Sequence, residues 1–292
     1  MSKGGESPPF GKGDTRLEEK IKSPMGFILI LPALSVLGLL YVFPLIRAIW
    51  SSFYDRAGNF TLGNYAKVFE LYTRDIVYSV AMTAATVGVV LVISIAIASY
   101  LRFRDWKFLD YMYRLPLFIP FLIVGHAMRI FLAPHGTLNA LLTRIIGVEE
   151  LPGISGSWTG LLFSFVWVMT PFATLIILGA FKALEPAYVE AAQNLGASKL
   201  RIIFDILIPL SGPSIMVATI LTFVRTISSL TIPLMVGPNK PNMITIDMMF
   251  RVNYFNDWGV ANSLGVISYL IVMVLAIYYL RYMVAERGGI KG

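Results

Sequence analysis

The chain has 292 residues, of which 57% are hydrophobic and 14% are charged. This composition is too apolar for an ordinary soluble domain of this length and predicts a protein of the lipid bilayer. The absence of cysteine excludes disulfides, thiolate metal sites and cysteine nucleophiles. The net charge of +7 comes from basic residues that flank apolar runs, a pattern of membrane orientation and not of nucleic-acid binding.

Six apolar runs are each long enough to cross a hydrocarbon core of about 30 Å. In chain order they cover residues 25–46, 76–101, 115–132, 158–181, 213–236 and 263–282. The first run is longer than a signal-peptide core and lacks a small-residue cleavage site, so it predicts an uncleaved helix. The pattern predicts an all-α integral membrane protein with a six-helix domain over residues 24–283.

The ends of the chain and the basic residues predict its orientation. Residues 1–23 mix Gly, Ser and Pro with charges of both signs and predict a mobile tail, and residues 284–292 predict a short basic tail. This layout places fifteen Lys and Arg residues in the inner segments and six in the outer loops. Because basic residues concentrate on the cytoplasmic side, both termini and the loop at 185–212 are predicted to be cytoplasmic.

The loop at 185–212 has the punctuation of two short helices. Pro186 suits a first helical position and Gly196 suits a left-handed cap, which predicts a helix over residues 186–195. Ser198 can cap a second helix, and Pro209 is expected to end it. The spacing places four apolar side chains of this second helix on one face: Leu200, Ile203, Phe204 and Leu207.

The same loop carries a family motif. Glu190, Ala191 and Ala192 are followed after three residues by Gly196, and after nine more by a run that ends in Pro209. This spacing resembles the EAA motif, E-A-A-x3-G-x9-I-x-L-P, of the permease subunits of bacterial ATP-binding cassette importers. The only departure is Ile208 where Leu is usual.

The resemblance implies a type I importer permease that works by alternating access. In that family the first short helix of the loop is a coupling helix, which docks into a groove on a separate ATPase subunit. Glu190 would be a charged contact, Ala191 and Ala192 would allow close approach, and Gly196 would form the turn. From the residues alone, the alternative is an interfacial helix without a partner.

The resemblance also implies partners. They are two ATPase subunits, a second permease subunit and a solute-binding protein on the outer side. The second permease is expected to be a different chain, and the membrane is expected to be the cytoplasmic membrane of a bacterium or archaeon. ATP and Mg would be used by the ATPase, because the only Gly-Lys dipeptide, Gly11-Lys12, is not in a phosphate-binding loop. No cofactor, metal or enzymatic activity is expected on this chain, since His126 and His135 lack suitable acidic neighbours and no HExxH or GxSxG occurs.

Three ionisable residues fall inside the apolar runs, where charge is costly and tends to face a cavity or another subunit. His126 and Arg129 share a helix face, and Arg225, about twelve residues beyond Pro213, is expected near mid-depth of the membrane. They are candidates for the translocation path. The alternatives are that Arg129 reaches the outer surface and that Arg225 binds backbone carbonyls. Trp167 can stack on a solute, but packing against lipid or a helix is favoured.

Three further stretches resemble the spermidine/putrescine branch more than the sugar branch: residues 114–142, 230–249 and 255–270. That branch also contains permeases for ferric iron, thiamine and phosphonates. The runs carry Arg and His but no Asp or Glu, which fits an anionic or neutral solute better than a polyamine. Sugar, phosphonate, thiamine and iron permeases are therefore alternatives. A secondary transporter is more distant, because it should show inverted repeats and intramembrane carboxylates.

Overall fold

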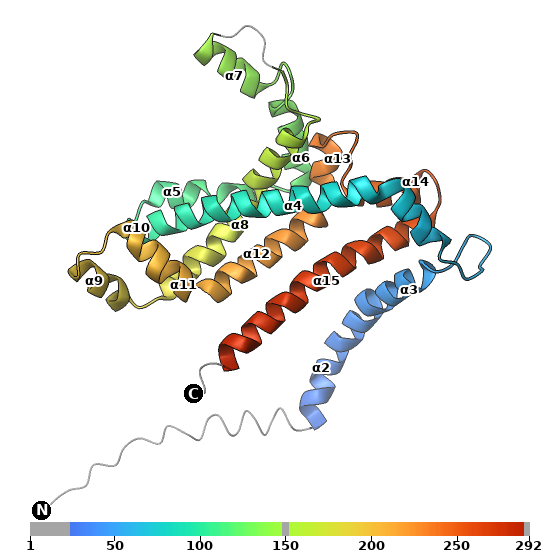
Figure 1. The fold of residues 1–292 in the computed structure, drawn as a ribbon, viewed down its shortest axis with the longest axis horizontal. Coiled ribbons are helices and arrows are strands. Elements are labelled where there is room, and N and C mark those ends of the chain that lie inside the picture. The colour runs from blue at the N-terminus through green and yellow to red at the C-terminus, as the bar shows by residue number, and fades with distance from the viewer. Residues whose placement is uncertain (1–23, 148–151, 289–292) are drawn as a thin grey trace, which may run out of the picture. The chain divides into compact units, whose positions relative to one another are not determined.

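The computed structural model describes residues 24–147 and 152–288, and these ranges are helical apart from loops and one isolated bridge between Tyr54 and Phe60 (Figure 1). The predicted tail at 1–23 and the last four residues of the predicted tail at 284–292 lie outside the described residues. Within the described ranges, four helices are long and apolar enough to cross a membrane, and the number rises to six if each of two bent helix pairs is one span. The all-α membrane architecture is therefore confirmed. The chain forms two units, which meet in sequence between Ser51 and Ser52.

The first unit is one apolar helical stretch. It consists of α2 (Pro24–Leu37), a π-helical turn η1 (Gly38–Val42) and α3 (Phe43–Ser51). The part from Ile28 to Ser51 qualifies as a membrane span, and none of its side chains is buried within the chain. In a bilayer the apolar side chains of such a helix must face lipid or protein.

The second unit is built around a single long helix. α4 (Gly63–Phe103) has 41 residues and is about 60 Å long, twice the thickness of a hydrocarbon core. It begins well before the predicted start at residue 76, because hydropathy marks where a helix is apolar and not where it begins. Its polar first part therefore places Asp75 inside a helix.

The helix α8 (Trp158–Ala183) packs along α4 and forms most of the core with it. Phe165, Ile177 and Phe181 are fully buried in this core. The hydroxyl of Ser157 caps α8 by accepting a hydrogen bond from the Gly160 N–H. The predicted span at 158–181 is confirmed to within two residues.

The third apolar run is not a straight helix. The chain forms α5 (Lys107–Met112), a 3₁₀ turn η2 (Leu115–Phe118) and then α6 (Phe121–Phe131), with a bend of 105°. Pro120 forces Ile119 into an extended conformation and starts the new helix. The predicted single helix over 115–132 is therefore wrong, because hydropathy does not register the proline break.

The fifth apolar run is also divided. α12 (Gly212–Ile227) is followed by an irregular link at 228–230 and by the short helix α13 (Thr231–Val236). α13 packs on α6, where a Cβ at Gly125 would lie 3.3 Å from the Met235 Cγ. The predicted continuous helix over 213–236 is wrong at its C-terminal end.

Three more helices complete the unit. α7 (Thr137–Ile146) follows α6, and α14 (Ile244–Asn253) packs on the long α15 (Trp258–Gly288). α15 also contacts α4 through a second apolar cluster that includes Val68, Val260 and Leu264. Since α15 reaches Gly288, the first part of the predicted tail at 284–292 is helical.

Candidate functional site

A short helix and a tight turn follow α8. The helix α9 (Pro186–Asn194) ends in a Schellman motif, in which Ala197 N–H donates to the Ala192 carbonyl (3.0 Å) and Gly196 N–H donates to the Gln193 carbonyl (2.9 Å). Gly196 has a φ of +81°, in the left-handed region that favours glycine. The predicted helix and its glycine cap are confirmed, and the helix ends one residue earlier than expected.

The loop presents one face to the protein and the other to its surroundings. Val189 is buried and Ala192 is half-buried against the core. Glu190 and Ala191 are exposed, and Leu195 beside the turn is 89% exposed. Ala192 therefore packs within this chain, while Glu190, Ala191 and Leu195 are the side chains available to a partner.

The loop is also tied to α4. The Arg102 guanidinium donates a hydrogen bond of 3.4 Å to the carbonyl of Leu184, which precedes α9. Together with the burial of Val189, this bond fixes the start of α9 against the ends of α4 and α8. A displacement of α9 would therefore be transmitted to α4 and α8, which form most of the core.

The second part of the loop begins as predicted. The hydroxyl of Ser198 accepts a hydrogen bond from the Arg201 N–H (3.3 Å) and caps α10 (Lys199–Ile202). A π-helical turn η3 (Ile203–Leu207) and the short helix α11 (Ile208–Leu210) continue it.

Pro209 does not end this helix as predicted. It is exposed within α11, and the helix ends at Leu210 before a 76° bend into α12. The wider π turn, in which Ile208 N–H bonds to the Ile203 carbonyl, accommodates the proline ring that an α-helical turn would bring against a carbonyl.

The predicted apolar face of this helix is only partly right. Leu207 is fully buried in the core, because the π turn rotates it away from its expected neighbours. The other three residues, Leu200, Ile203 and Phe204, line a groove against α4.

Arg225 lies in the last turn of α12, where a cation suits the helix dipole. Its guanidinium carbon is 4.4 Å from the ring centre of Phe172 in α8 and 5.5 Å from that of Phe121 in α6. These ring contacts, and not the backbone carbonyls considered above, hold the side chain among the described residues.

His126 and Arg129 are both exposed on α6, three residues apart. Within the described ranges, no hydrogen bond, ion pair or ring contact joins either of them to Arg225. The three predicted residues therefore do not form one contact cluster in this chain. His126 and Arg129 are available to solvent, lipid or another subunit.

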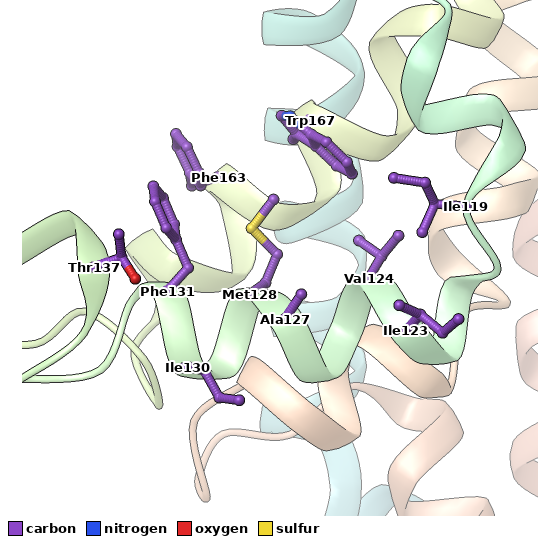
Figure 2. Close-up of a pocket in the computed structure, with 10 residues that line it drawn as sticks. All are labelled: Ile119, Ile123, Val124, Ala127, Met128, Ile130, Phe131, Thr137, Phe163 and Trp167. Carbon is purple, nitrogen blue, oxygen red and sulfur yellow. The ribbon is translucent and has the colours of Figure 1, made fainter.

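An open pocket of about 620 Å³ lies between α6 and α8 (Figure 2). Its walls are almost entirely apolar and include Met128, Phe131, Phe163 and Trp167. The rings of Phe131 and Phe163 stack with centroids 6.5 Å apart. Since no ionisable side chain lines the pocket, it suits hydrocarbon or an apolar side chain, and this surrounding favours packing over solute stacking for Trp167.

A polar cluster lies on the N-terminal half of α4, where the loop before α14 packs against this helix. Asp75 accepts hydrogen bonds from Lys240 Nζ (3.0 Å) and from the Asn242 N–H (2.7 Å). The hydroxyl of Ser79 accepts one from the Ile244 N–H (2.8 Å). These bonds fix the start of α14 on α4.

Asp247 of α14 belongs to the same cluster and is only 3% exposed. Its Oδ1 lies 3.7 Å from Lys240 Nζ, and its Oδ2 is buried without a hydrogen-bond partner. Burial and the nearby Asp75 carboxylate raise the pKa of Asp247 to about 6, against the opposing influence of Lys240. This carboxylate therefore titrates close to neutral pH.

Arg251 extends the cluster along α14. Its Nε donates to the Tyr72 hydroxyl (2.6 Å), and its Nη1 lies 3.4 Å from a carboxylate oxygen of Asp257. The guanidinium also stacks at 5.2 Å on Tyr72 and 5.0 Å on Phe255. A single arginine thus links α4, α14 and the start of α15.

A family model described as "Binding-protein-dependent transport system inner membrane component" matches residues 88–287. The chain belongs to this family. The match covers the α9 loop and both divided spans, so the expected class, the permease subunit of an ABC importer, is confirmed.

Curated relatives of the permease differ in the solute that their names give. It is 25% identical over 291 residues to the trehalose/maltose permease MalF of Thermococcus litoralis, covering 92% of this chain and 97% of that one. It is 27% identical over 229 residues to the spermidine/putrescine permease PotB of Escherichia coli, covering 75% and 82%. The molybdenum permease ModB of Azotobacter vinelandii is 27% identical over 167 residues, covering 55% and 72%. Similarity therefore does not select a solute.

Solved structures confirm the fold of the permease. It superposes with a TM-score of 0.75 on a chain of a bacterial alginate ABC transporter, at 18% identity, covering 90% of this chain and 96% of the other. A chain of the MetNI methionine ABC transporter gives a TM-score of 0.58 at 16% identity, covering 75% and 97%.

The structure adds residues that the sequence reasoning missed in the permease. Tyr188 and Leu195 are large exposed side chains on the α9 loop. Leu195 between Asn194 and Gly196 was a usable signal of a docking surface, since a loop that contacts only solvent does not require an apolar residue there. Asp75 and Asp247 were missed because they lie 172 positions apart and only tertiary structure brings them together.

Proposed function

We propose that the permease transports a small polar solute by alternating access, driven by two ATPase subunits, one of which docks on the cytoplasmic α9 loop. The loop combines the properties that a docking element needs. Its helix starts at Pro186, ends in a Schellman motif and is anchored by Val189 and Arg102, so docking orders few groups. Its outer face offers the charge of Glu190, the small Ala191 and the apolar Leu195.

The observation that carries the proposal is the rigid turn at Gly196. A left-handed glycine in a Schellman motif exposes Leu195 and Glu190 on one short element while Val189 points inward. α8 leads through Leu184 into this element, and Arg102 of α4 donates a hydrogen bond to the Leu184 carbonyl. This provides the mechanical connection from an ATPase to the membrane region.

The partners follow from the same reasoning. α2 and α3 leave every described side chain of the span from Ile28 to Ser51 unburied, which supports contact with lipid or a second permease chain, for which we favour a different protein. A solute-binding protein is proposed on the outer face. The host membrane is proposed to be the cytoplasmic membrane of a bacterium or archaeon, with both termini of the chain inside.

Cross-linking tests the docking proposal directly, because the chain has no cysteine that would complicate labelling. Glu190→Cys and Leu195→Cys should each form a cross-link to an ATPase subunit in isolated membranes, and ATP should change its yield. Asn239→Cys, exposed in the loop before α14, is the matched control and should form none. If neither loop cysteine cross-links, or if both react from the outside of intact cells, the proposal is wrong.

For the solute, we favour a neutral or anionic polar molecule over a polyamine. Arg225 is held by aromatic rings, without a neutralising carboxylate among its described contacts, so its charge is available to an anion or a polar group. Carboxylates at Asp75 and Asp247 are already engaged with Lys240. The polyamine interpretation, from the resemblance to the spermidine/putrescine branch, is the alternative.

A solute panel decides between them. The reconstituted complex, with its ATPase and binding protein, should show ATPase stimulation by one member of a panel containing trehalose, maltose, molybdate, a phosphonate, thiamine, an iron chelate, spermidine and putrescine. Stimulation by spermidine or putrescine alone would contradict the preference for a neutral or anionic solute.

A further inference from the structure

A groove of about 550 Å³ lies between the C-terminal half of α4 and the helix that follows the α9 loop. We call it the α4–η3 groove. One wall is formed by α4 and the other by α10, η3 and α11. Its lining residues are Val92, Ile95, Ala96, Ser99, Tyr100, Phe103, Arg104, Lys199, Leu200, Ile203, Phe204 and Ile208.

The two charged residues of the α4–η3 groove lie at the same end. Arg104 directly follows the last residue of α4, and Lys199 is the first residue of α10. The Lys199 ammonium lies 5.9 Å from the ring centre of Phe103, which places it at the mouth beside the end of α4. Both cations are exposed. Among the residues that the structure describes, the lining contains no carboxylate, so neither charge is neutralised by the groove itself.

A buried hydroxyl lies further in. Ser99 is 4% exposed, lines the groove, and its Oγ has no hydrogen-bond partner. A buried hydroxyl without a partner costs about 1–3 kcal/mol, so a ligand oxygen at this point would remove a penalty. Beyond Ser99 the lining is aliphatic, from Ala96 and Ile95 to Val92.

The spacing along α4 has the order of a phospholipid. Ser99 is five residues and Val92 twelve residues before Arg104, hence about 7 Å and about 18 Å along the helix axis. The cation Arg104 therefore lies at one end, and the hydroxyl of Ser99 follows at a distance that the ester groups of a phospholipid can reach. The apolar part of the groove then extends over most of the thickness of one leaflet. The opposite wall has the same order, from Lys199 to Ile208.

From this juxtaposition we infer that the α4–η3 groove binds one anionic phospholipid of the cytoplasmic leaflet. Its phosphate lies between Arg104 and Lys199, an ester oxygen accepts from Ser99, and an acyl chain fills the apolar part. The inference requires the proposed cytoplasmic position of the α9 loop, because the charged end of the groove must coincide with the inner surface. The bound lipid would contact the segment that connects the α9 loop to α12.

The test measures lipid retained by the complete detergent-extracted complex. The complex is equilibrated in nanodiscs of phosphatidylglycerol and phosphatidylcholine with matched acyl chains, and retained lipid is counted by native mass spectrometry. Phosphatidylglycerol should be retained in preference. Arg104→Gln combined with Lys199→Gln should weaken retention about 25-fold, since each basic residue near an anionic surface contributes about fivefold.

Matched variants keep the result interpretable. Lys107, the first residue of α5, and Lys182, in the last turn of α8, are exposed cations outside the groove. The double variant Lys107→Gln and Lys182→Gln therefore removes the same charge and should retain the lipid as the parent does. Ala96→Trp fills the apolar part without changing charge and should also displace the lipid. A photoreactive phenylalanine analogue at Phe204 should cross-link to phospholipid.

Three outcomes would overturn the inference. They are equal retention of phosphatidylcholine and phosphatidylglycerol, equal losses in the two double variants, and a cross-link from position 204 to a protein chain, which would make the groove a subunit interface. The accessibility of cysteines in the α9 loop distinguishes failure of the lipid site from failure of the proposed function. A loop that is reactive from outside the cell would contradict both the proposed function and the lipid site. A cytoplasmic loop without lipid retention would contradict only the lipid site.

Discussion

Replacement of Gly196 by residues with a side chain should weaken docking of the ATPase in a graded way. Gly196 has a φ of +81°, and a Cβ there would meet no atom within 4 Å. The substitution therefore introduces backbone strain without a steric clash. Left-handed backbone costs an L-residue about 1–2 kcal/mol, less for asparagine and more for a β-branched residue.

The strain should appear mainly in the docked state. An undocked loop can relax by opening the Schellman motif, whereas a docked loop must keep its conformation. A penalty of about 1–2 kcal/mol then corresponds to an affinity about 5- to 30-fold weaker for Gly196→Ala. Gly196→Asn should lose less, and Gly196→Val should lose more.

The assay is titration of purified ATPase onto the permease in nanodiscs, followed by uptake in proteoliposomes. Gly147→Ala is the matched control, because Gly147 caps α7 with a φ of +73° and also has nothing within 4 Å of a Cβ. It imposes the same strain in a loop predicted to lie on the outer side and should leave ATPase affinity unchanged. Equal affinity of the Gly196 series and the Gly147 control would refute this reasoning.

Three further predictions concern the charged residues. Burial raises the pKa of Asp247 to about 6, so the folded protein binds the Asp247 proton more tightly than the unfolded chain does. The contribution of Asp247 to the free energy of unfolding therefore falls as the pH rises from about 4 through 6. Asp247→Asn should therefore raise stability at pH 7.5 by at most about 3 kcal/mol and little at pH 4; a gain in melting temperature independent of pH would contradict this. Arg225→Leu should reduce uptake at least tenfold in a fully assembled complex. Arg225→Lys should give an intermediate uptake, because lysine keeps the charge but stacks less well on Phe172. Normal uptake by the Leu variant would exclude a role of Arg225 in the translocation path. Arg251→Lys should destabilise the protein by about 1–2 kcal/mol and Tyr72→Phe by about 1 kcal/mol; additive losses in the double variant would show that the contact between them contributes nothing.

The α9 loop shows how far the sequence could lead. Its signals are local: proline at a helix start, glycine in a left-handed cap and serine before the next helix act within a few residues, so the order of helices was predictable. The register beyond Ile203 was not. The π turn arises where Pro209 must be accommodated, and it buries Leu207 while leaving Phe204 exposed.

The candidate sites divide in the same way. The sequence identified Arg225 because a charge inside an apolar run is unusual, yet the rings that hold it come from α6 and α8. It also identified His126 and Arg129, but could not show that they are separate from Arg225. The pairing of Asp75 with Lys240 was invisible, since each residue alone looks like an ordinary loop charge.

The sequence by itself determined that this is a helical membrane protein with a capped polar loop, because hydropathy, capping and proline effects depend on neighbours along the chain. Tertiary structure alone decided where the third and fifth apolar runs break, which face of each helix is buried, and which distant charges meet. Those outcomes depend on contacts between residues far apart in the chain, and a local pattern carries no information about them.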